Sequence, residues 1–260
     1  MRPASDGQVP VLLIGRAGSR GVPGKNTMPI LGRPLMAYPL LAAAQAGAVD
    51  TVYLSTDGPE IKRVGRSFGA QILDRPPALC TASALVEDVV VHGYEQIVHR
   101  ERRPVPIFVL LFCNSATVTP GLIDQGVKAL QDDATIDSAV SVSLYNEYSP
   151  VRAKRIGKDG LLAPYVDVDQ IPGASCDRDS ATPAYFCDCS LWVLRDRCVQ
   201  LGQGQLPFRW MGHRSLPLHQ SGGLDIDHDY GVAMTEHWLR KHGFTEDSTP
   251  YTVAVQATTS

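Results

Sequence analysis

The chain has 260 residues, of which 44% are hydrophobic and 20% are charged, and its formal net charge is −3. This is the composition of an ordinary soluble α/β domain with an insertion, and the charge balance gives no reason to expect nucleic acid or an anionic membrane as a partner. We expect a cytoplasmic protein, because the N-terminal MRPASDGQ lacks an apolar signal-peptide core and no later apolar run is long enough to span a bilayer.

Residues 11–26, VLLIGRAGSRGVPGKN, predict a buried strand followed by a phosphate-binding loop. The aliphatic run Val11–Ile14 is typical of a parallel strand covered on both faces. The glycines after it let backbone N–H groups converge on phosphate oxygens, and two arginines and a lysine supply positive charge. The loop is neither a Walker loop nor a GxGxxG motif, and an ordinary surface turn with solvated basic side chains is the alternative.

Strands and helices alternate from this loop to about residue 143. Helices are predicted over 34–47, 59–69, 83–100 and 120–131, and strands over 50–58, 70–73, 105–112 and 137–143. Pro34 is expected in the first turn of the first helix, and Ser83 is expected to cap the third. This order predicts an α/β fold with a doubly wound, mostly parallel Rossmann-like sheet, whose ligands lie at the carboxyl ends of the strands.

From Leu144 onward the pattern changes to short strands punctuated by Pro, Gly and Asp. A β-hairpin is predicted to turn at Lys158–Gly160, a further strand over 185–194, and a last helix over 227–244. The predicted organisation is a nucleotide-binding catalytic domain of residues 1–143 and 224–244, an inserted arm and acceptor-side segment of residues 144–223, and a tail of residues 245–260.

Asp225 and Asp227 alternate with Leu224 and Ile226, which in a strand would place both carboxylates on one face. Two carboxylates together with phosphate oxygens are a usual arrangement for Mg²⁺ at nucleotide-transfer sites. The alternative is that Asp227 only caps the following helix. The six cysteines include no CxxC pair, so reduced thiols are expected.

Three motifs resemble those of CMP-sialic acid synthetases and related cytidylyltransferases: GRAGSRGVPGKN (15–26), YLSTDGPEIKRVGRSFGAQILDRP (53–76) and LDID (224–227). The resemblance implies a nucleotidyltransferase that uses CTP and Mg²⁺ or another divalent cation. It would transfer CMP to an acidic acceptor, a sialic, nonulosonic or Kdo-like sugar acid, and release pyrophosphate. In the resembled family the inserted arm dimerises, so a homodimer is also implied.

The resemblance also assigns roles to individual residues. Arg16 and Lys25 would be catalytic, with Arg16 stabilising charge at the α-phosphorus, and Asp225 and Asp227 would hold the metal. The implied nucleotide-binding residues are Gly15, Arg16, Ala17, Gly18, Ser19, Arg20, Lys25, Asn26, Arg75 and Asn114. The implied acceptor-binding residues are Asn114, Arg152, Arg178 and Asp188.

Two stretches depart from the family pattern. LLFCNSATVT (110–119) puts Phe112 and Val118 where the family has Gln and Arg, and Asp188-Cys189 stands where the family has Asn-Gly. We therefore expect this chain to use CTP as the CMP donor, as the family does, but to use a different acceptor. A phosphonate or phosphate-bearing acceptor is the alternative, with anchors in Arg152, Lys154, Arg155 and Arg178. A GT-A-like glycosyltransferase and a non-catalytic nucleotide-binding protein are more remote.

Overall fold

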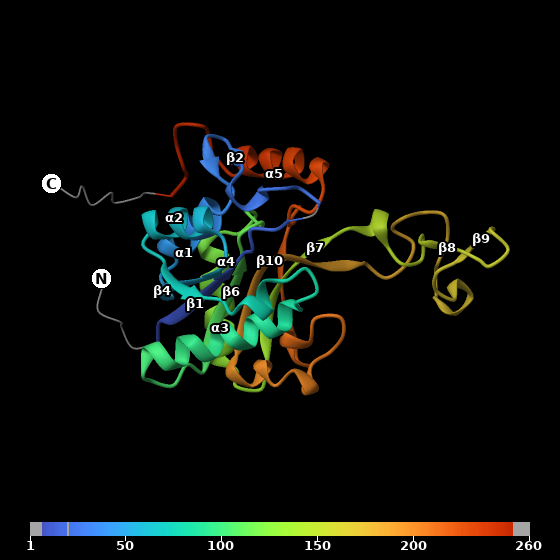
Figure 1. The fold of residues 1–260 in the computed structure, drawn as a ribbon. Coiled ribbons are helices and arrows are strands. Elements are labelled where there is room, and N and C mark those ends of the chain that lie inside the picture. Colours follow the sequence, from blue (N-terminus) through green and yellow to red (C-terminus); the bar gives the residue numbers. More distant parts are fainter. Residues whose placement is uncertain (1–6, 20, 252–260) are drawn as a thin grey trace.

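The structure is a computed structural model that describes residues 7–19 and 21–251. The strands of its central sheet are, in chain order, β1 (Val9–Ile14), β4 (Val49–Thr56), β5 (Gln71–Asp74), β6 (Ile107–Phe112), β7 (Ser138–Leu144), β10 (Tyr185–Arg195) and β11 (Ser215–Gln220). Their spatial order is β11-β7-β10-β6-β1-β4-β5, and β10 runs antiparallel to both of its neighbours while the other pairs are parallel (Figure 1). The predicted mostly parallel sheet is confirmed.

Helices cover both faces of this sheet. The helices are α1 (Ala37–Gln45), α2 (Pro59–Ser67), α3 (Val86–Glu101), α4 (Pro120–Asp132) and α5 (Asp229–Lys241). In β1, Val11 and Leu13 pack into the core under α1, α2 and α4, whereas Leu12 and Ile14 pack into the core under α3. The unbroken aliphatic run of β1 is thus explained, because both of its faces are buried.

Two predicted helix starts are wrong. Pro34 does not begin a helix: it lies in β3 (Arg33–Pro34), which pairs with β2 (Pro29–Ile30) across a tight turn. Ser83 does not cap α3, since the residue before that helix is Leu85 and no side chain caps it. Residues 81–84 instead form a turn, in which the Ala84 N–H donates to Thr81 Oγ1 at 3.1 Å.

A third apolar cluster joins α5 to the segment after β1. Ile226, Trp238 and Leu239 pack with Leu35 and Tyr38 there. The cluster fixes the chain just before α5 against the body of the domain. Part of the predicted tail belongs to the same region, because residues 245–251 lie on the domain and the Tyr251 hydroxyl donates to Val118 O at 3.3 Å.

Beyond β7 and β10 the chain forms an arm that stands away from the body (Figure 1). It carries the hairpin β8 (Lys154–Ile156) and β9 (Leu162–Pro164), whose turn is closed by the Gly160 N–H on Gly157 O at 3.0 Å, as predicted. Several apolar residues of the arm are exposed to solvent: Ile156 is 77% and Leu162 is 74% exposed. Within the predicted inserted arm and acceptor-side segment of residues 144–223, β10 and β11 belong to the central sheet, so the projecting arm is shorter than that segment.

None of the helices in the described ranges combines the length and apolar character needed to cross a membrane.

Candidate functional site

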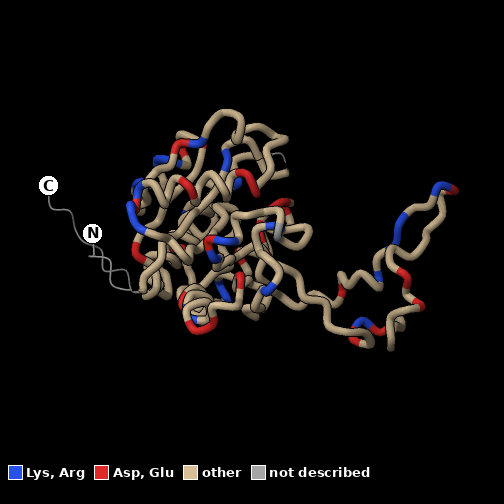
Figure 2. The backbone as a smooth tube through the Cα atoms, turned by 90° about the horizontal axis from the view of Figure 1, so that it is seen from below, with Lys and Arg blue, Asp and Glu red and all other residues tan. Residues whose placement is uncertain are grey.

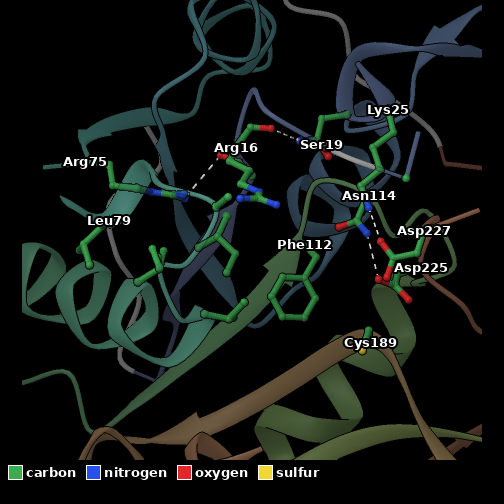
Figure 3. A pocket seen from close by; sticks show the side chains of 18 of the residues that line it. Arg16, Ser19, Lys25, Arg75, Leu79, Phe112, Asn114, Cys189, Asp225 and Asp227 are labelled. Atoms are coloured by element: carbon green, nitrogen blue, oxygen red, sulfur yellow. Dashed lines mark hydrogen bonds and ion pairs between the residues drawn. The ribbon is translucent and has the colours of Figure 1, made fainter. Parts of the chain in front are cut away.

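A cavity of about 410 Å³ opens where β1, β5 and β6 end (Figure 3). This is the position expected for a ligand in a doubly wound sheet. Polar residues of its lining come from four separate stretches of the chain: Gly15, Arg16, Ser19, Gly21, Lys25 and Asn26 from the loop after β1, Arg75 from the end of β5, Asn114 from the end of β6, and Asp225 and Asp227 from the segment before α5.

Two hydrogen bonds fix the loop after β1, one within the loop and one to a residue that follows β4. Asn26 Nδ2 donates to Arg16 O at 2.9 Å, which closes the two ends of the loop on each other. The Ala17 N–H donates to Asp57 Oδ1 at 2.9 Å, which fastens the loop to the residues after β4. These two hydrogen bonds hold the predicted phosphate-binding loop against the end of β4 and close its two ends on each other.

The same loop touches the segment before α5. Lys25 Nζ donates to the Asp227 carboxylate and to Ile226 O. At Gly21 a Cβ atom would lie 2.1 Å from the Asp227 carbonyl oxygen, so only glycine allows this approach. Residues at opposite ends of the chain are thus brought into direct contact at the pocket.

Two arginines supply further positive charge. Arg75 Nη2 donates to Ser55 O at 2.7 Å and to Gly15 O at 3.4 Å, which fixes its guanidinium between the ends of β4 and β1. Burial lowers the pKa of Arg75. Arg16 Nη1 donates to Thr81 O at 3.3 Å. Among the described residues, neither arginine forms an ion pair, so both charges are available to an anionic ligand.

Asp225 and Asp227 lie side by side at the pocket, facing Asn114 and Lys25 (Figure 3). Burial, reinforced by repulsion from Asp227, raises the pKa of Asp225, although Lys25 and a hydrogen bond from Asn114 Nδ2 at 2.9 Å oppose this rise. Asp227 is 64% exposed. Within the described chain, no group of three or more His, Cys, Asp or Glu side chains could hold a metal ion. Two carboxylates beside the predicted phosphate-binding loop nevertheless fit Mg²⁺, which takes its other ligands from phosphates and water.

The local structure around these carboxylates differs from the sequence expectation. The segment 224–227 is not a strand, because side chains replace the strand ladder: Thr117 Oγ1 accepts from the Leu224 N–H at 2.9 Å and donates to Leu224 O at 3.0 Å. The predicted alternation of apolar and acidic side chains still holds, since Ile226 is buried while the carboxylates of Asp225 and Asp227 face the pocket. The helix-capping alternative is wrong: His228 occupies the N-cap of α5, and no side chain caps that helix.

Several residues assigned from the resemblance lie outside the pocket. Asp188 is buried and accepts hydrogen bonds from Ser141 Oγ, Ser143 Oγ, Gln220 Nε2 and the Ser190 N–H at 2.5–3.1 Å. Its carboxylate is therefore fully engaged in holding β10, and we correct its assignment to the acceptor.

Arg152 and Arg178 belong to the arm, which stands away from the body of the domain (Figure 2). Arg178 forms an ion pair with Asp179. Ala17 and Gly18 belong to the loop but do not line the pocket. Arg20 lies outside the described residues. Val118 is buried in the core, so it cannot contact a ligand where the family has its arginine.

Other residues of the pocket were not anticipated. They are mostly apolar: Leu79 from a short 3-10 helix (Pro77–Cys80), Ala84, Val86 and Val89 from the start of α3 and the turn before it, and Cys189, Phe208 and Trp210 from β10 and the connection that follows it. Phe112, which the sequence already placed where the family has its glutamine, lines the pocket with them. The sequence signal available for Phe208 and Trp210 was a pair of aromatic residues in a Pro- and Gly-rich connection. It was overlooked because that connection was assigned to the arm.

Comparison with known proteins identifies relatives of this chain. A sequence model of the cytidylyltransferase family matches residues 11–145, just over half of the 260 residues. N-acylneuraminate cytidylyltransferase of Oncorhynchus mykiss is 34% identical over 225 residues, which make up 86% of this chain and 49% of that protein. CMP-N,N'-diacetyllegionaminic acid synthase of Legionella pneumophila is 40% identical over 57 residues, 22% of this chain and 25% of that protein. The chain thus spans half or less of the length of these curated relatives.

Solved structures share the fold. A CMP:2-keto-3-deoxy-manno-octonic acid synthetase complexed with CTP aligns with a TM-score of 0.65 at 14% identity, over 90% of this chain and 99% of its own. The 4-diphosphocytidyl-2C-methyl-D-erythritol synthase of Anaerococcus prevotii aligns with a TM-score of 0.60 at 12% identity, over 90% and 97%. The sequence match, the nucleotidyltransferase fold and the site motifs agree with one another. The chain therefore belongs to the cytidylyltransferase family.

Proposed function

We propose that this chain transfers CMP from CTP to a small acidic acceptor and releases pyrophosphate. One observation carries the proposal: a glycine-rich loop, two arginines with no described ion-pair partner and two carboxylates meet around one cavity, although they come from distant parts of the sequence. Family membership supports cytidylyl transfer, and the names of the relatives support a sugar acid as acceptor.

Each group has a place in this reaction. Asp225 and Asp227 would hold Mg²⁺, which neutralises charge on the triphosphate when it is bound. The N–H groups of the loop, Ser19 and Lys25 would bind the phosphates. Arg16 would stabilise the charge that builds up as an acceptor oxygen bonds to the α-phosphorus and the bond to the leaving pyrophosphate breaks. Catalysis of this kind depends chiefly on positioning and electrostatics.

The acceptor is proposed to be a sialic, nonulosonic or Kdo-like sugar acid. A phosphonate or phosphate-bearing molecule is a second candidate, because Phe112 lines the pocket where the family has a glutamine that could bind a sugar hydroxyl. The anchors expected for that candidate, Arg152, Lys154, Arg155 and Arg178, are all on the arm, so they could serve only a neighbouring subunit.

A homodimer would meet this requirement. The exposed apolar side chains of the arm, including Ile156, Leu162 and Tyr165, are unusual for a surface that stays in water. We expect sedimentation equilibrium to give twice the chain mass. Changing Ile156 and Leu162 together to Ser should shift the equilibrium to monomers, and a wild-type monomer at micromolar concentration would contradict the proposed dimer.

The activity test measures pyrophosphate release with Mg²⁺ and each of CTP, UTP, ATP and GTP. Each nucleotide is combined with N-acetylneuraminate, Kdo and 2-hydroxyethylphosphonate. We expect release with CTP and at least one acid, and its loss when EDTA removes the metal. Equal thermal stabilisation by all four nucleotides, with no release from any pair, would contradict cytidylyl transfer.

A further inference from the structure

The family motif at the end of β4 contains three polar residues that lie outside the pocket. They are Ser55, Thr56 and Asp57, and none of them lines the cavity. Ser55 and Thr56 are buried, and Asp57 is half-buried. Because buried polar groups are nearly always hydrogen-bonded, the partners of these side chains indicate what the motif does.

Asp57 holds the loop after β1 from behind. The Ala17 N–H donates to Asp57 Oδ1 at 2.9 Å, and Ala17 is the neighbour of Arg16, which lines the pocket. A hydrogen bond to an ionised acceptor is about twice as strong as one between neutral groups. The loop also packs closely here, since a Cβ added at Gly58 would lie 3.4 Å from Ala17 Cβ. Asp57 therefore fixes the backbone that carries Arg16.

Ser55 holds the second pocket arginine. Arg75 Nε donates to Ser55 Oγ at 3.2 Å, and Arg75 Nη2 donates to Ser55 O at 2.7 Å. The guanidinium is planar and its donors have a fixed geometry, so two bonds to one residue restrict its rotation. Arg75 lines the pocket, whereas Ser55 lies behind it. Ser55 therefore sets the direction of a pocket side chain without touching a ligand.

Asp57 also acts on Arg75 through charge. Burial lowers the pKa of Arg75, and the negative charge of Asp57 opposes this shift. Among the residues that the structure describes, Asp57 and Arg75 form no ion pair, so the arginine keeps its charge for an anionic ligand. Thr56 serves the turn itself, because its Oγ1 accepts the Gly58 N–H at 3.1 Å.

We propose that Ser55 and Asp57 are positioning residues for nucleotide binding: Asp57 fixes the loop after β1, and Ser55 fixes Arg75. The two cationic sides of the pocket are thereby held in one geometry by the end of a single strand. This inference rests on the proposed function. Neither residue is catalytic, since neither reaches the pocket.

The first test measures hydrogen exchange of the Ala17 amide by NMR, on the whole chain without nucleotide. Asp57→Ala removes the acceptor, so exchange of this amide should accelerate about tenfold or more while amides of β6 stay protected. Asp57→Asn retains an oxygen at the same place and should restore most of the protection. Glu60→Ala is the matched control, because it removes a nearby carboxylate that bonds only to Arg63, and it should change nothing.

The second test measures CTP affinity by calorimetry with Mg²⁺. Asp57→Ala should weaken binding about tenfold, and Asp57→Asn should bring it back to within about threefold of wild type. Ser55→Ala frees Arg75 Nε and should weaken binding about fivefold, without changing exchange of the Ala17 amide. In steady-state assays, Asp57→Ala should raise the KM for CTP by the same factor and leave the KM for the acceptor unchanged, which a general loss of stability would not do.

The outcomes separate the two proposals. If the variants change exchange and CTP affinity as expected but no acceptor gives pyrophosphate, the proposed reaction fails and the positioning role stands. That role is overturned if wild type binds no CTP, if Asp57→Ala leaves exchange and affinity unchanged, if Asp57→Asn is as weak as Asp57→Ala, or if Glu60→Ala has the same effect.

Discussion

Lys25 and Asp227 are 202 positions apart in the sequence, yet Lys25 Nζ contacts the Asp227 carboxylate at the mouth of the pocket. Asp227 is largely exposed, so this ion pair adds little to the stability of the fold. Its importance is geometric, because it joins the proposed phosphate loop to the proposed metal ligands. The same two residues would have to separate partly when a metal binds Asp227, which would leave Lys25 free to bind phosphate.

Replacing Gly21 by Ala should disrupt this junction. The added Cβ would lie 2.1 Å from the Asp227 carbonyl oxygen, so either the loop or the segment 224–227 must move. We expect kcat/KM for CTP to fall by roughly a hundredfold or more, as is typical when reacting groups are displaced by about 1 Å. Gly18→Ala is the matched control, since a Cβ there has no described atom within 4 Å. A similar loss in both variants would point to loop flexibility and contradict the steric explanation.

Asp227→Ala should separate activity from stability. Removing an exposed carboxylate that caps no helix should change the free energy of unfolding by less than about 1 kcal/mol. The extra thermal stabilisation that Mg²⁺ gives to the CTP-bound protein should disappear, together with turnover. Asp229→Ala, in the first turn of α5, controls for the loss of a nearby negative charge. Turnover retained by Asp227→Ala would remove this residue from the proposed metal site.

Thr117→Val tests the hydroxyl network behind Asp225. The Thr117 side chain is fully buried, and loss of its hydroxyl leaves the Leu224 N–H without its partner, whereas Leu224 O keeps the hydrogen bond from Ser115 Oγ at 3.0 Å. One unsatisfied buried N–H should lower the free energy of unfolding, measured by urea denaturation, by about 1–3 kcal/mol. Activity should fall too, because this contact places the segment that carries Asp225. Thr117→Ser retains the hydroxyl and should recover most of the activity; no recovery would mean that packing of the methyl group matters more than the hydrogen bonds.

Asp137→Asn gives a stability difference that depends on pH. Partial burial would raise the pKa of Asp137, but hydrogen bonds from the Arg214 and His213 N–H groups and from Arg197 outweigh it and lower the pKa below the ordinary value of 3.8. Its stabilising effect is therefore fully present above pH 3.8 and is lost as pH falls through the lowered, folded-state pKa.

We expect urea denaturation to show Asp137→Asn less stable than wild type by about 1–3 kcal/mol at pH 7. This difference should begin to shrink below pH 3.8, where the carboxyl of the unfolded chain becomes protonated, and should be lost as pH falls through the lowered folded-state pKa. Asp133→Asn, whose exposed carboxylate bonds only within its own turn, should show a much smaller difference at both pH values. A constant difference for Asp137→Asn across the pH range would contradict the charge-based explanation.

Local sequence determined the elements and the loop. The aliphatic run of β1 and the prolines that begin α2 and α4 specify their structures through short-range geometry. The glycine-rich loop carrying Lys25 predicts an anion site on similarly local grounds. The identity of the family followed from motifs whose residues are proposed to contact phosphate or metal, because such contacts restrict residue type strongly.

Tertiary structure decided what lies opposite those motifs. Asp188 looked like a ligand-binding carboxylate, but donors from β7 and β11, both distant in sequence, meet in the fold to engage it completely. Phe208 and Trp210 line the pocket because β11 pairs with β7, and this pairing brings the connection between β10 and β11 close to the sheet. Apolar contacts of this kind accept many residue types, so they leave no motif in the sequence, and only the assembled sheet shows which side chains face the ligand.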